Sequence, residues 1–209
     1  SVEGYYKPIQ NQIDCKDGSN VISNEPIEPQ LLFGKGRAYG VEMLLRKNKG
    51  KFTGWIGYTL SRTEKQIDGI NNNDWYVARQ DRTHDLSIVA IYEVSKRLTL
   101  SGTFVYYTGN AVSFPSGKYK IDNQVVFLYT ERNGYRMPAY HRLDLSGTIK
   151  LGKGKKRLQS ELVLGVYNAY GRQNAYVITF REDPNDASRT QALQTALFRF
   201  VPSITYNFK

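Results

Sequence analysis

The stretch Phe198-Arg-Phe-Val-Pro-Ser-Ile-Thr-Tyr-Asn-Phe208 decides the fold, because every second residue in it is apolar. Side chains of a β-strand point alternately to its two faces, so a strand with this pattern has one face suited to hydrocarbon and one suited to water. Seven further segments show the same alternation, with aromatic residues near many of their ends. Repetition of such a strand along a chain is typical of an outer-membrane β-barrel.

The alternating segments predict eight antiparallel strands. A strand that crosses a bilayer needs about nine to eleven residues, whereas strands of soluble sandwiches have about five or six. Most of the predicted strands reach the longer length, so the predicted fold class is all-β, an antiparallel transmembrane β-barrel segment. The predicted strands are Ser1–Gln10, Leu32–Lys47, Lys51–Glu64, Arg79–Val94, Leu98–Gly109, Pro138–Leu151, Leu158–Phe180 and Leu193–Lys209.

The links between these segments alternate in length. Three short links are rich in cations: Arg46–Lys51, Ser95–Arg97 and Lys153–Arg157. Outer-membrane barrels have short periplasmic turns and long extracellular loops, so we expect the basic turns at one end of the sheet and the long links at the other. Cations confined to turns suit an anionic membrane surface. The four long links are Asn11–Leu31, Lys65–Ala78, Asn110–Met137 and Arg181–Ala192.

Composition excludes several other classes. The 209 residues are 40% hydrophobic with a net charge of +10, and mean hydropathy is −0.51. No apolar run approaches the ~20 residues of a transmembrane helix. The positive charge does not indicate nucleic-acid binding, because there is no recognition motif and no basic helix. The single cysteine, Cys15, cannot form an internal disulfide and is interpreted as an incidental thiol.

The alternation also assigns faces. Phe52, Ile56, Leu143, Leu145 and Ile149 are expected on the outward, lipid-facing side of the sheet. A charge at mid-depth on that side would cost a few kcal/mol, which fixes the register. The opposite face carries charges that are predicted to form polar ladders in a lumen or to contact a plug, and these are Glu42, Arg142, Asp144 and Glu161.

No catalytic residue, cofactor or metal site is predicted. His84 and His141 lie beside arginine and aspartate, but no nucleophile motif or metal-ligand spacing accompanies them. Aromatic residues in the long links are candidates for binding a substrate, because loops on a rigid scaffold accumulate binding residues. Anchoring at the membrane interface and packing within the loops are the alternatives for these residues, which include Trp75, Tyr76, Tyr119, Tyr129 and Tyr135.

Five stretches together resemble the C-terminal barrel region of TonB-dependent outer-membrane receptors, especially the Bacteroidetes type. They are spread along nearly the whole chain in the order that the family shows. The stretches are GRAYGVEMLLRKNKGKFTGWIGYTLSRT from Gly36 to Thr63, DRTHDLS from Asp81 to Ser87, YHRLDLS from Tyr140 to Ser146, VYNAYGRQNAY from Val166 to Tyr176, and PSITYNFK from Pro202 to Lys209.

The resemblance implies a barrel of about 22 strands, plugged by an N-terminal domain, of which residues 1–209 supply about the last eight. It implies import of a scarce nutrient, such as a metal chelate, vitamin, glycan or peptide, across the outer membrane of a Gram-negative bacterium. The plug and the TonB box are not in this chain. The expected partners are the upstream part of the barrel, the plug, the TonB complex, lipid and lipopolysaccharide, and a surface lipoprotein is a further candidate.

The resemblance also implies that the last strand carries the barrel assembly signal. Tyr206 and Phe208 alternate at its end, and the insertion machinery would recognise this strand by adding it to its own sheet edge. Anchoring of both rings at the periplasmic interface is the alternative.

Two other architectures remain open at this point. One is a self-contained eight-stranded outer-membrane barrel with a structural or adhesive role. Small residues on the predicted lumen side, such as Gly40, Thr53, Thr59 and Ser146, favour a wider barrel, because an eight-stranded barrel is filled by its own side chains. The other is a soluble ligand-binding β-barrel, which the aromatic strand ends and basic turns fit poorly.

Overall fold

The computed structural model describes residues 1–16, 26–121, 124–129, 131–151 and 160–208. Strands dominate it, and the only helices in these ranges are two short 3-10 turns, η1 (Glu28–Gln30) and η2 (Asn71–Asn73). The strands are β1 (Val2–Cys15), β2 (Leu31–Lys47), β3 (Phe52–Ile67), β4 (Tyr76–Val77), β5 (His84–Glu93), β6 (Leu98–Tyr107), β7 (Ala111–Val112), β8 (Gly117–Ile121), β9 (Gln124–Leu128), β10 (Tyr135–Arg136), β11 (Tyr140–Lys150), β12 (Ser160–Tyr167), β13 (Val177–Asp183), β14 (Asp186–Thr195) and β15 (Val201–Phe208).

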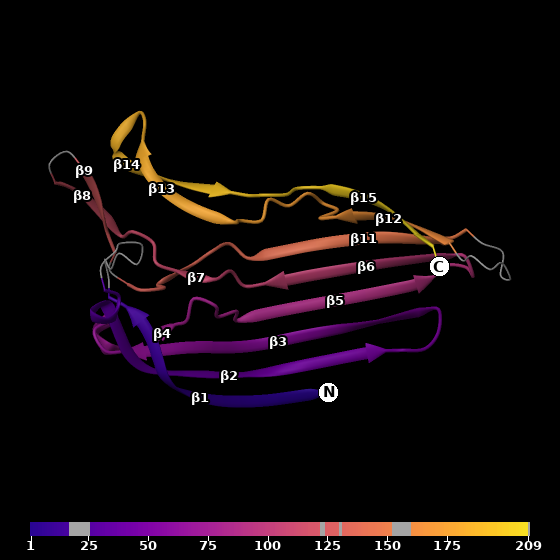
Figure 1. Cartoon of the computed structure of the whole chain (residues 1–209), viewed down its shortest axis with the longest axis horizontal. Coiled ribbons are helices and arrows are strands. Elements are labelled where there is room, and N and C mark those ends of the chain that lie inside the picture. The colour runs from indigo at the N-terminus through magenta and orange to yellow at the C-terminus, as the bar shows by residue number, and fades with distance from the viewer. Residues whose placement is uncertain (17–25, 122–123, 130, 152–159, 209) are drawn as a thin grey trace.

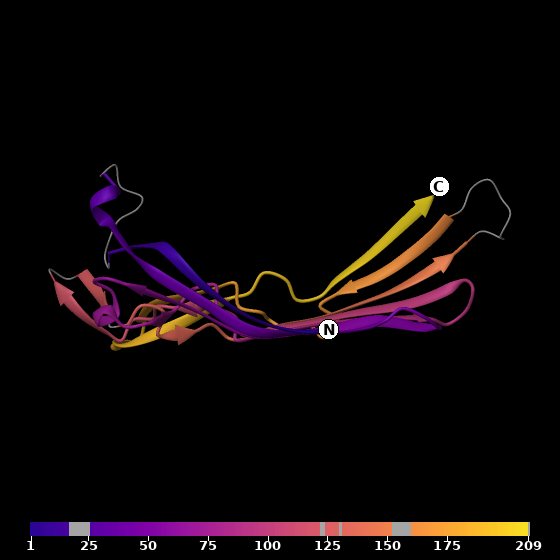
Figure 2. The ribbon, with the colours of Figure 1, turned by 90° about the horizontal axis from the view of Figure 1, so that it is seen from below.

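One antiparallel sheet forms the body of the molecule, with the strand order β1-β2-β3-β5-β6-β11-β12-β15 and β4 added beside β3 (Figure 1). Each of these long strands pairs with its neighbour along the path, as in a meander. Among the described residues, β1 pairs only with β2 and β15 only with β12. The sheet is therefore open, and Figure 2 shows it as a bent and twisted layer rather than a ring.

Eight long strands are confirmed, but the predicted strand Leu158–Phe180 is wrong. It is split into β12 and β13, and only β12 belongs to the main sheet. The chain turns at Asn168 and Gly171, which have φ angles of 54° and 65°. Buried Asn168 fixes this turn, because its Nδ2 donates to the Arg172 carbonyl and its Oδ1 accepts from the Arg172 N–H.

Three other boundaries differ from the prediction by at least five residues. The first strand runs on to Cys15, past a bulge at Asn11, where φ is 54°. The fourth begins at His84 rather than Arg79, because Asp81 holds the preceding segment in a turn against β3. The last begins at Val201 rather than Leu193, since the residues up to Thr195 belong to β14, which forms a separate hairpin with β13.

The register confirms which residues share each face of the sheet. Cross-strand partners on one face form an apolar row that consists of Leu45, Ile56, Ile88, Phe104 and Leu143. A second apolar row on the same face consists of Phe52, Tyr92, Leu100, Gly147, Leu164 and Ile204. We call this the apolar face. The opposite, polar face carries rows such as Ser101, Ser146, Gly165 and Ser203, in which the Ser101 and Ser146 hydroxyls lie 2.7 Å apart.

No second layer covers the apolar face in the described part of the chain, because the remaining strands form separate two-stranded pairs at the loop end (Figure 1). Ile204 and Phe208 are 75% and 74% exposed, and Leu145 is 47% exposed. The small buried core lies instead at the end of the sheet, where Ile67, Ile70 and Tyr76 pack together with Leu32. Burial of apolar side chains therefore stabilises the loop end of the molecule. The body of the sheet depends on its backbone hydrogen bonds and on the surroundings of its apolar face.

The links separate as predicted. The long links emerge at one end of the sheet and contain η1, η2 and the short strands β4, β7, β8, β9, β10, β13 and β14, on the left of Figure 1. At the other end, Phe52 pairs with Tyr92 and Tyr92 with Leu100, so the turns that contain Lys49 and Lys96 lie side by side. This confirms the prediction for two basic turns. The third, Lys153–Arg157, lies outside the described residues.

No helix within the described ranges has both the length and the apolar character that a membrane-crossing helix requires.

Gly54 tests the packing of the sheet. Its φ is +150°, and a Cβ there would overlap the backbone carbonyl of Val89 on β5. We expect Gly54→Ala to lower the free energy of unfolding by about 1–3 kcal/mol, because the neighbouring strand must move. Gly147→Ala in β11 is the matched control, since its Cβ would meet only Leu100 at 3.5 Å. Urea unfolding of both variants checks this, and equal losses would contradict the close approach of β3 and β5.

Candidate functional site

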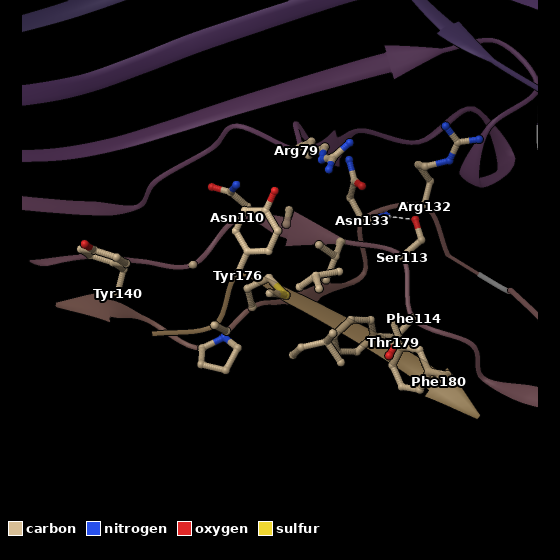
Figure 3. A pocket seen from close by; sticks show the side chains of 18 of the residues that line it. Arg79, Asn110, Ser113, Phe114, Arg132, Asn133, Tyr140, Tyr176, Thr179 and Phe180 are labelled. Carbon is tan, nitrogen blue, oxygen red and sulfur yellow. Dashed lines mark hydrogen bonds between the residues drawn. The ribbon is translucent and has the colours of Figure 1, made fainter. Parts of the chain in front are cut away.

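A cavity of about 870 Å³ lies at the loop end of the sheet, where the long links meet (Figure 3). Its walls come from the links on either side of β7 and β10, from the strand ends near Tyr107 and Tyr140, and from β13. Figure 3 shows Arg79, Asn110 and Asn133 along one side, and Phe114 and Phe180 along the other. A large hollow with converging polar groups and exposed rings is the usual form of a ligand site.

An ion pair between Asp81 and Arg136 joins two of the links that form the cavity. Asp81, from the DRTHDLS stretch, is 1% exposed, and its carboxylate accepts from the Thr63 N–H and forms an ion pair with the Arg136 guanidinium. Arg136 also donates to the carbonyls of Asp81 and Gly109, both at 3.1 Å. The link between β6 and β11 is therefore anchored on the segment that enters β5.

Arg132 and Asn133 connect three links. Arg132 Nη1 lies 2.7 Å from Asp14 Oδ1, and its Nη2 donates to the Cys15 carbonyl at the end of β1. Its backbone exchanges two hydrogen bonds with the side chain of Asn71. Asn133 Nδ2 donates to the Val77 carbonyl. These bonds fix the position of the links around the cavity before any ligand arrives.

A ladder of arginine and tyrosine side chains begins in the wall of the cavity and continues along the polar face. The Arg82 guanidinium is 3.8 Å from the centre of the Tyr107 ring, and the Tyr107 and Tyr140 rings stack at 4.6 Å. Arg142 donates to the hydroxyls of Tyr140 and Tyr167 and lies 4.0 Å from the centre of the Tyr167 ring. Tyr107 and Tyr140 are direct cross-strand neighbours, so the sheet itself brings these two rings together.

The predicted lumen residues lie on the polar face but do not form one ladder. Arg142 pairs with Asp144 at 2.9 Å, and Asp144 accepts the N–H of Asn168. Glu161 accepts from Asn207 at 3.1 Å. Glu42 lies opposite Glu3 on β1, in a shallow hollow apart from the others. Contact of these residues with a plug stays a prediction.

The five aromatic residues that the sequence proposed for substrate binding are dispersed. Trp75 lies 4.1 Å from the Arg37 guanidinium, and Tyr76 is buried with its hydroxyl 2.9 Å from Asp14 Oδ2. Tyr119 is exposed on β8, and Tyr135 stacks on the Phe114 ring at 5.6 Å.

Of the five, Tyr129 lines the cavity directly, and its side chain is 53% exposed. Substrate binding by all five stays a prediction. Within the long link Asn110–Met137, β9 pairs with β8.

The β8–β9 hairpin and the β13–β14 hairpin contact each other. Lys118 Nζ, at the base of the β8–β9 hairpin, lies 3.3 Å from Glu182 Oε1 on β13. Near the tip of the β13–β14 hairpin, the Asn185 N–H and the Gln191 side chain each donate to Asp183 at 2.9 Å. These bonds lower the pKa of the Asp183 carboxyl, and the backbone N–H of Asn185 is the main cause. The carboxylate therefore stays ionised and fixes the tight turn.

The two histidines lie apart from the cavity. His84 Nδ1 is 2.8 Å from the Tyr58 hydroxyl, and His141 Nδ1 is 2.7 Å from the Tyr170 hydroxyl. Both contacts are between neighbouring strands or turns, and neither includes a nucleophile or a carboxylate. In the described ranges no three His, Cys, Asp or Glu residues gather as metal ligands would.

Sequence reasoning missed Arg79, Asp81, Arg132 and Arg136. Asp81 stood in a quoted stretch, but its partner Arg136 is 55 residues away, and no local pattern connects the two. The pairing of β7 with β10 places Arg136 opposite Ala111, and no local motif marks this long-range pair.

Comparison of the chain with protein-family models, with curated proteins and with solved structures found no match.

The ion pair between Asp81 and Arg136 gives a prediction. Arg136→Ala should lower the free energy of unfolding by about 3 kcal/mol, because it leaves the buried Asp81 carboxylate without its cation. Arg189→Ala is the control, since the Arg189–Asp186 pair is exposed and should contribute at most about 1 kcal/mol. Urea unfolding followed by tryptophan fluorescence measures both. Similar small losses would show that Asp81 is not the anchor of these links.

Proposed function

We propose that this chain is a wall segment of a larger transmembrane β-barrel in the outer membrane of a Gram-negative bacterium, and that the barrel is a TonB-dependent receptor that imports a scarce nutrient. The observation that carries the proposal is the uncovered apolar face of the single sheet. Transport and dependence on TonB rest on the resemblance of the five sequence stretches to that family.

The apolar face needs a non-aqueous neighbour. Two rows of mainly aliphatic and aromatic side chains run across five and six of the long strands, and together they extend from β2 to β15. Soluble proteins bury such a face against a second layer, and large exposed apolar patches on them mark interaction surfaces. Lipid hydrocarbon would contact all rows of this face at once. A soluble ligand-binding barrel requires the opposite arrangement, with its apolar face turned inward.

The two open edges favour a barrel larger than eight strands. β1 and β15 each have one unpaired edge in the described structure, and they lie at opposite sides of the sheet. Unpaired strand edges are not stable in hydrocarbon, so further strands are needed to close the ring. A self-contained eight-stranded barrel would need β1 to pair with β15, which this structure does not have.

The polar face fits a wide, wet or plugged lumen. Its side chains near the middle of the sheet are small, including Ser101, Ser146 and Ser203. Glu3 and Glu42 are direct neighbours on adjacent strands, and neither has a cationic partner among the described residues. Like charges placed opposite each other are destabilising, and a cation on a plug domain would relieve this repulsion.

The positions of the links agree with import from outside the cell. In outer-membrane barrels the long loops face the exterior and the short turns face the periplasm. The cavity, which lies among the long links, would then meet the nutrient first. The partners in this proposal are the remaining barrel, its plug, the TonB complex, lipid and lipopolysaccharide.

Arginine substitution on the two faces tests the proposal. Leu145→Arg in β11 should destabilise the complete protein in lipid vesicles by about 2–4 kcal/mol, because it would bring a charge into hydrocarbon. Ser146→Arg, one residue further, should have a much smaller effect, since Ser146 lies on the polar face. Urea unfolding in vesicles measures both, and equal costs would show that Leu145 does not face lipid.

The terminal aromatic residues test assembly. Tyr206 and Phe208 both lie on the apolar face of β15 and are 56% and 74% exposed. With both replaced by Ala in the complete protein, we expect the chain to accumulate unfolded in the periplasm, because the insertion machinery loses its recognition strand. Pulse labelling and heat-modified gel mobility follow the assembly rate. An unchanged rate with lower final stability would favour interfacial anchoring instead.

A further inference from the structure

We propose that the cavity at the loop end binds a carboxylated sugar, with Arg79 as the group that recognises the carboxylate. The inference deepens the proposed import function and rests on it for the direction from which the sugar arrives. The substrate class follows from side chains in the cavity wall that have no ion-pair or hydrogen-bond partner among the described residues.

Arg79 is the cation in the cavity wall that is free to bind an anion. Arg82 pairs with Asp85 at 3.2 Å, and Arg132 pairs with Asp14 at 2.7 Å. The Arg79 side chain is exposed, lines the cavity and forms no ion pair with any described residue. An arginine guanidinium matches a carboxylate with two parallel hydrogen bonds, which makes it well suited to this ligand.

The backbone of Arg79 is held in place although its side chain is free. The Arg79 carbonyl accepts the Ala111 N–H at 3.2 Å, and the N–H of buried Ala78 donates to the Thr63 carbonyl at 2.9 Å. The guanidinium therefore projects from a fixed point of the fold. Asp14, the acidic residue in the same wall, is occupied by Arg132 and by the Tyr76 hydroxyl, so it does not neutralise Arg79.

Uncharged polar groups beside Arg79 suit the hydroxyl groups of a sugar. The side chains of Asn110 and Thr179 line the cavity and form no hydrogen bond with the described residues. Asn133 uses its Nδ2 on the Val77 carbonyl, which leaves its carbonyl oxygen available. Figure 3 shows Asn110 and Asn133 on the same side of the cavity as Arg79. Amide groups of this kind can accept and donate at once, as sugar hydroxyls require.

Exposed aromatic rings supply the surface on which a sugar ring can lie. Tyr176 is 68% exposed and Tyr129 is 53% exposed, and neither ring stacks on another ring within the described ranges. Phe114 and Phe180 are already packed edge to face at 4.9 Å and form the opposite wall. A tyrosine offers an apolar face and a hydroxyl, so one side chain can contact both the ring and the hydroxyl groups of a sugar.

The combination favours a carboxylated sugar over two other ligands. A neutral sugar would leave the Arg79 guanidinium without an anionic partner. A flat aromatic carboxylate would satisfy Arg79 and the rings, but it would leave the amide and hydroxyl groups of Asn110, Asn133 and Thr179 unpaired. A ligand is preferred when it supplies partners to all the polar groups that line its site.

Calorimetry of the protein in detergent tests this site. The probe is a tetrasaccharide of uronic acid units, and the neutral tetrasaccharide with the same linkage is compared with it. We expect Arg79→Ala to weaken binding of the acidic probe at least tenfold and Arg79→Lys to weaken it less. Arg46→Ala is the control, because it removes one positive charge at the end of β2 that is far from the cavity. This variant should bind the acidic probe as the wild-type protein does.

Three results would overturn the proposal. They are equal affinity of the wild-type protein and Arg79→Ala for the acidic probe, an equal loss in Arg46→Ala, and equal binding of the acidic and neutral probes. Equal or tighter binding of benzoate would replace the sugar by an aromatic carboxylate. Circular dichroism of each variant confirms that the sheet is intact.

Uptake separates the site from the transport role. Cells that produce the complete protein should accumulate the labelled acidic probe only when TonB is present. Binding at the surface without TonB-dependent uptake would overturn the transport role and leave the site standing. If Leu145→Arg is costly in vesicles as expected but the acidic probe does not bind, the sugar site is overturned and the membrane location is not.

Discussion

The need to keep one face of a single sheet away from water governs this molecule. Eight long strands share one apolar face, and the described chain provides no second layer to cover it. Hydrophobic burial amounts to about 25 cal/mol per Å² of apolar surface, so an uncovered face of this size is a large cost in water. The small core of Ile67, Ile70 and Tyr76 cannot offset it. The structure is therefore intelligible only together with a surrounding that accepts apolar side chains.

Period-two alternation made the sheet predictable from the sequence. Moving a strand by one residue would exchange its two faces, so the apolar pattern fixes the pairing of neighbours such as Leu143 and Phe104. The alternation of long and short links placed both described basic turns at the same end. The order of the strands followed, because consecutive segments joined by tight turns pair with each other.

The sequence failed where long-range polar contacts override alternation. Residues from Leu158 to Phe180 alternate well enough to suggest one strand, but Asn168 bends the chain with its own side chain. Arg136 and Arg132 reach partners that are more than fifty residues away. No periodic signal encodes such pairs. The candidate aromatic residues were therefore a mixed group, in which Tyr129 lines the cavity while Tyr76 supports the fold from within.

The division of labour among the arginines connects the fold to the site. Arg136 forms an ion pair with Asp81 and Arg132 with Asp14, and both pairs hold the links in place. Arg82 forms an ion pair with Asp85 and lies over the Tyr107 ring. These ion pairs join the links around the cavity and leave Arg79 as a cation without an ion-pair partner among the described residues. The Arg79 charge stands outside the network, on a backbone that the network holds still. A site with this construction can change its ligand through a few free side chains, while the pairs beneath it keep the sheet and its links unchanged.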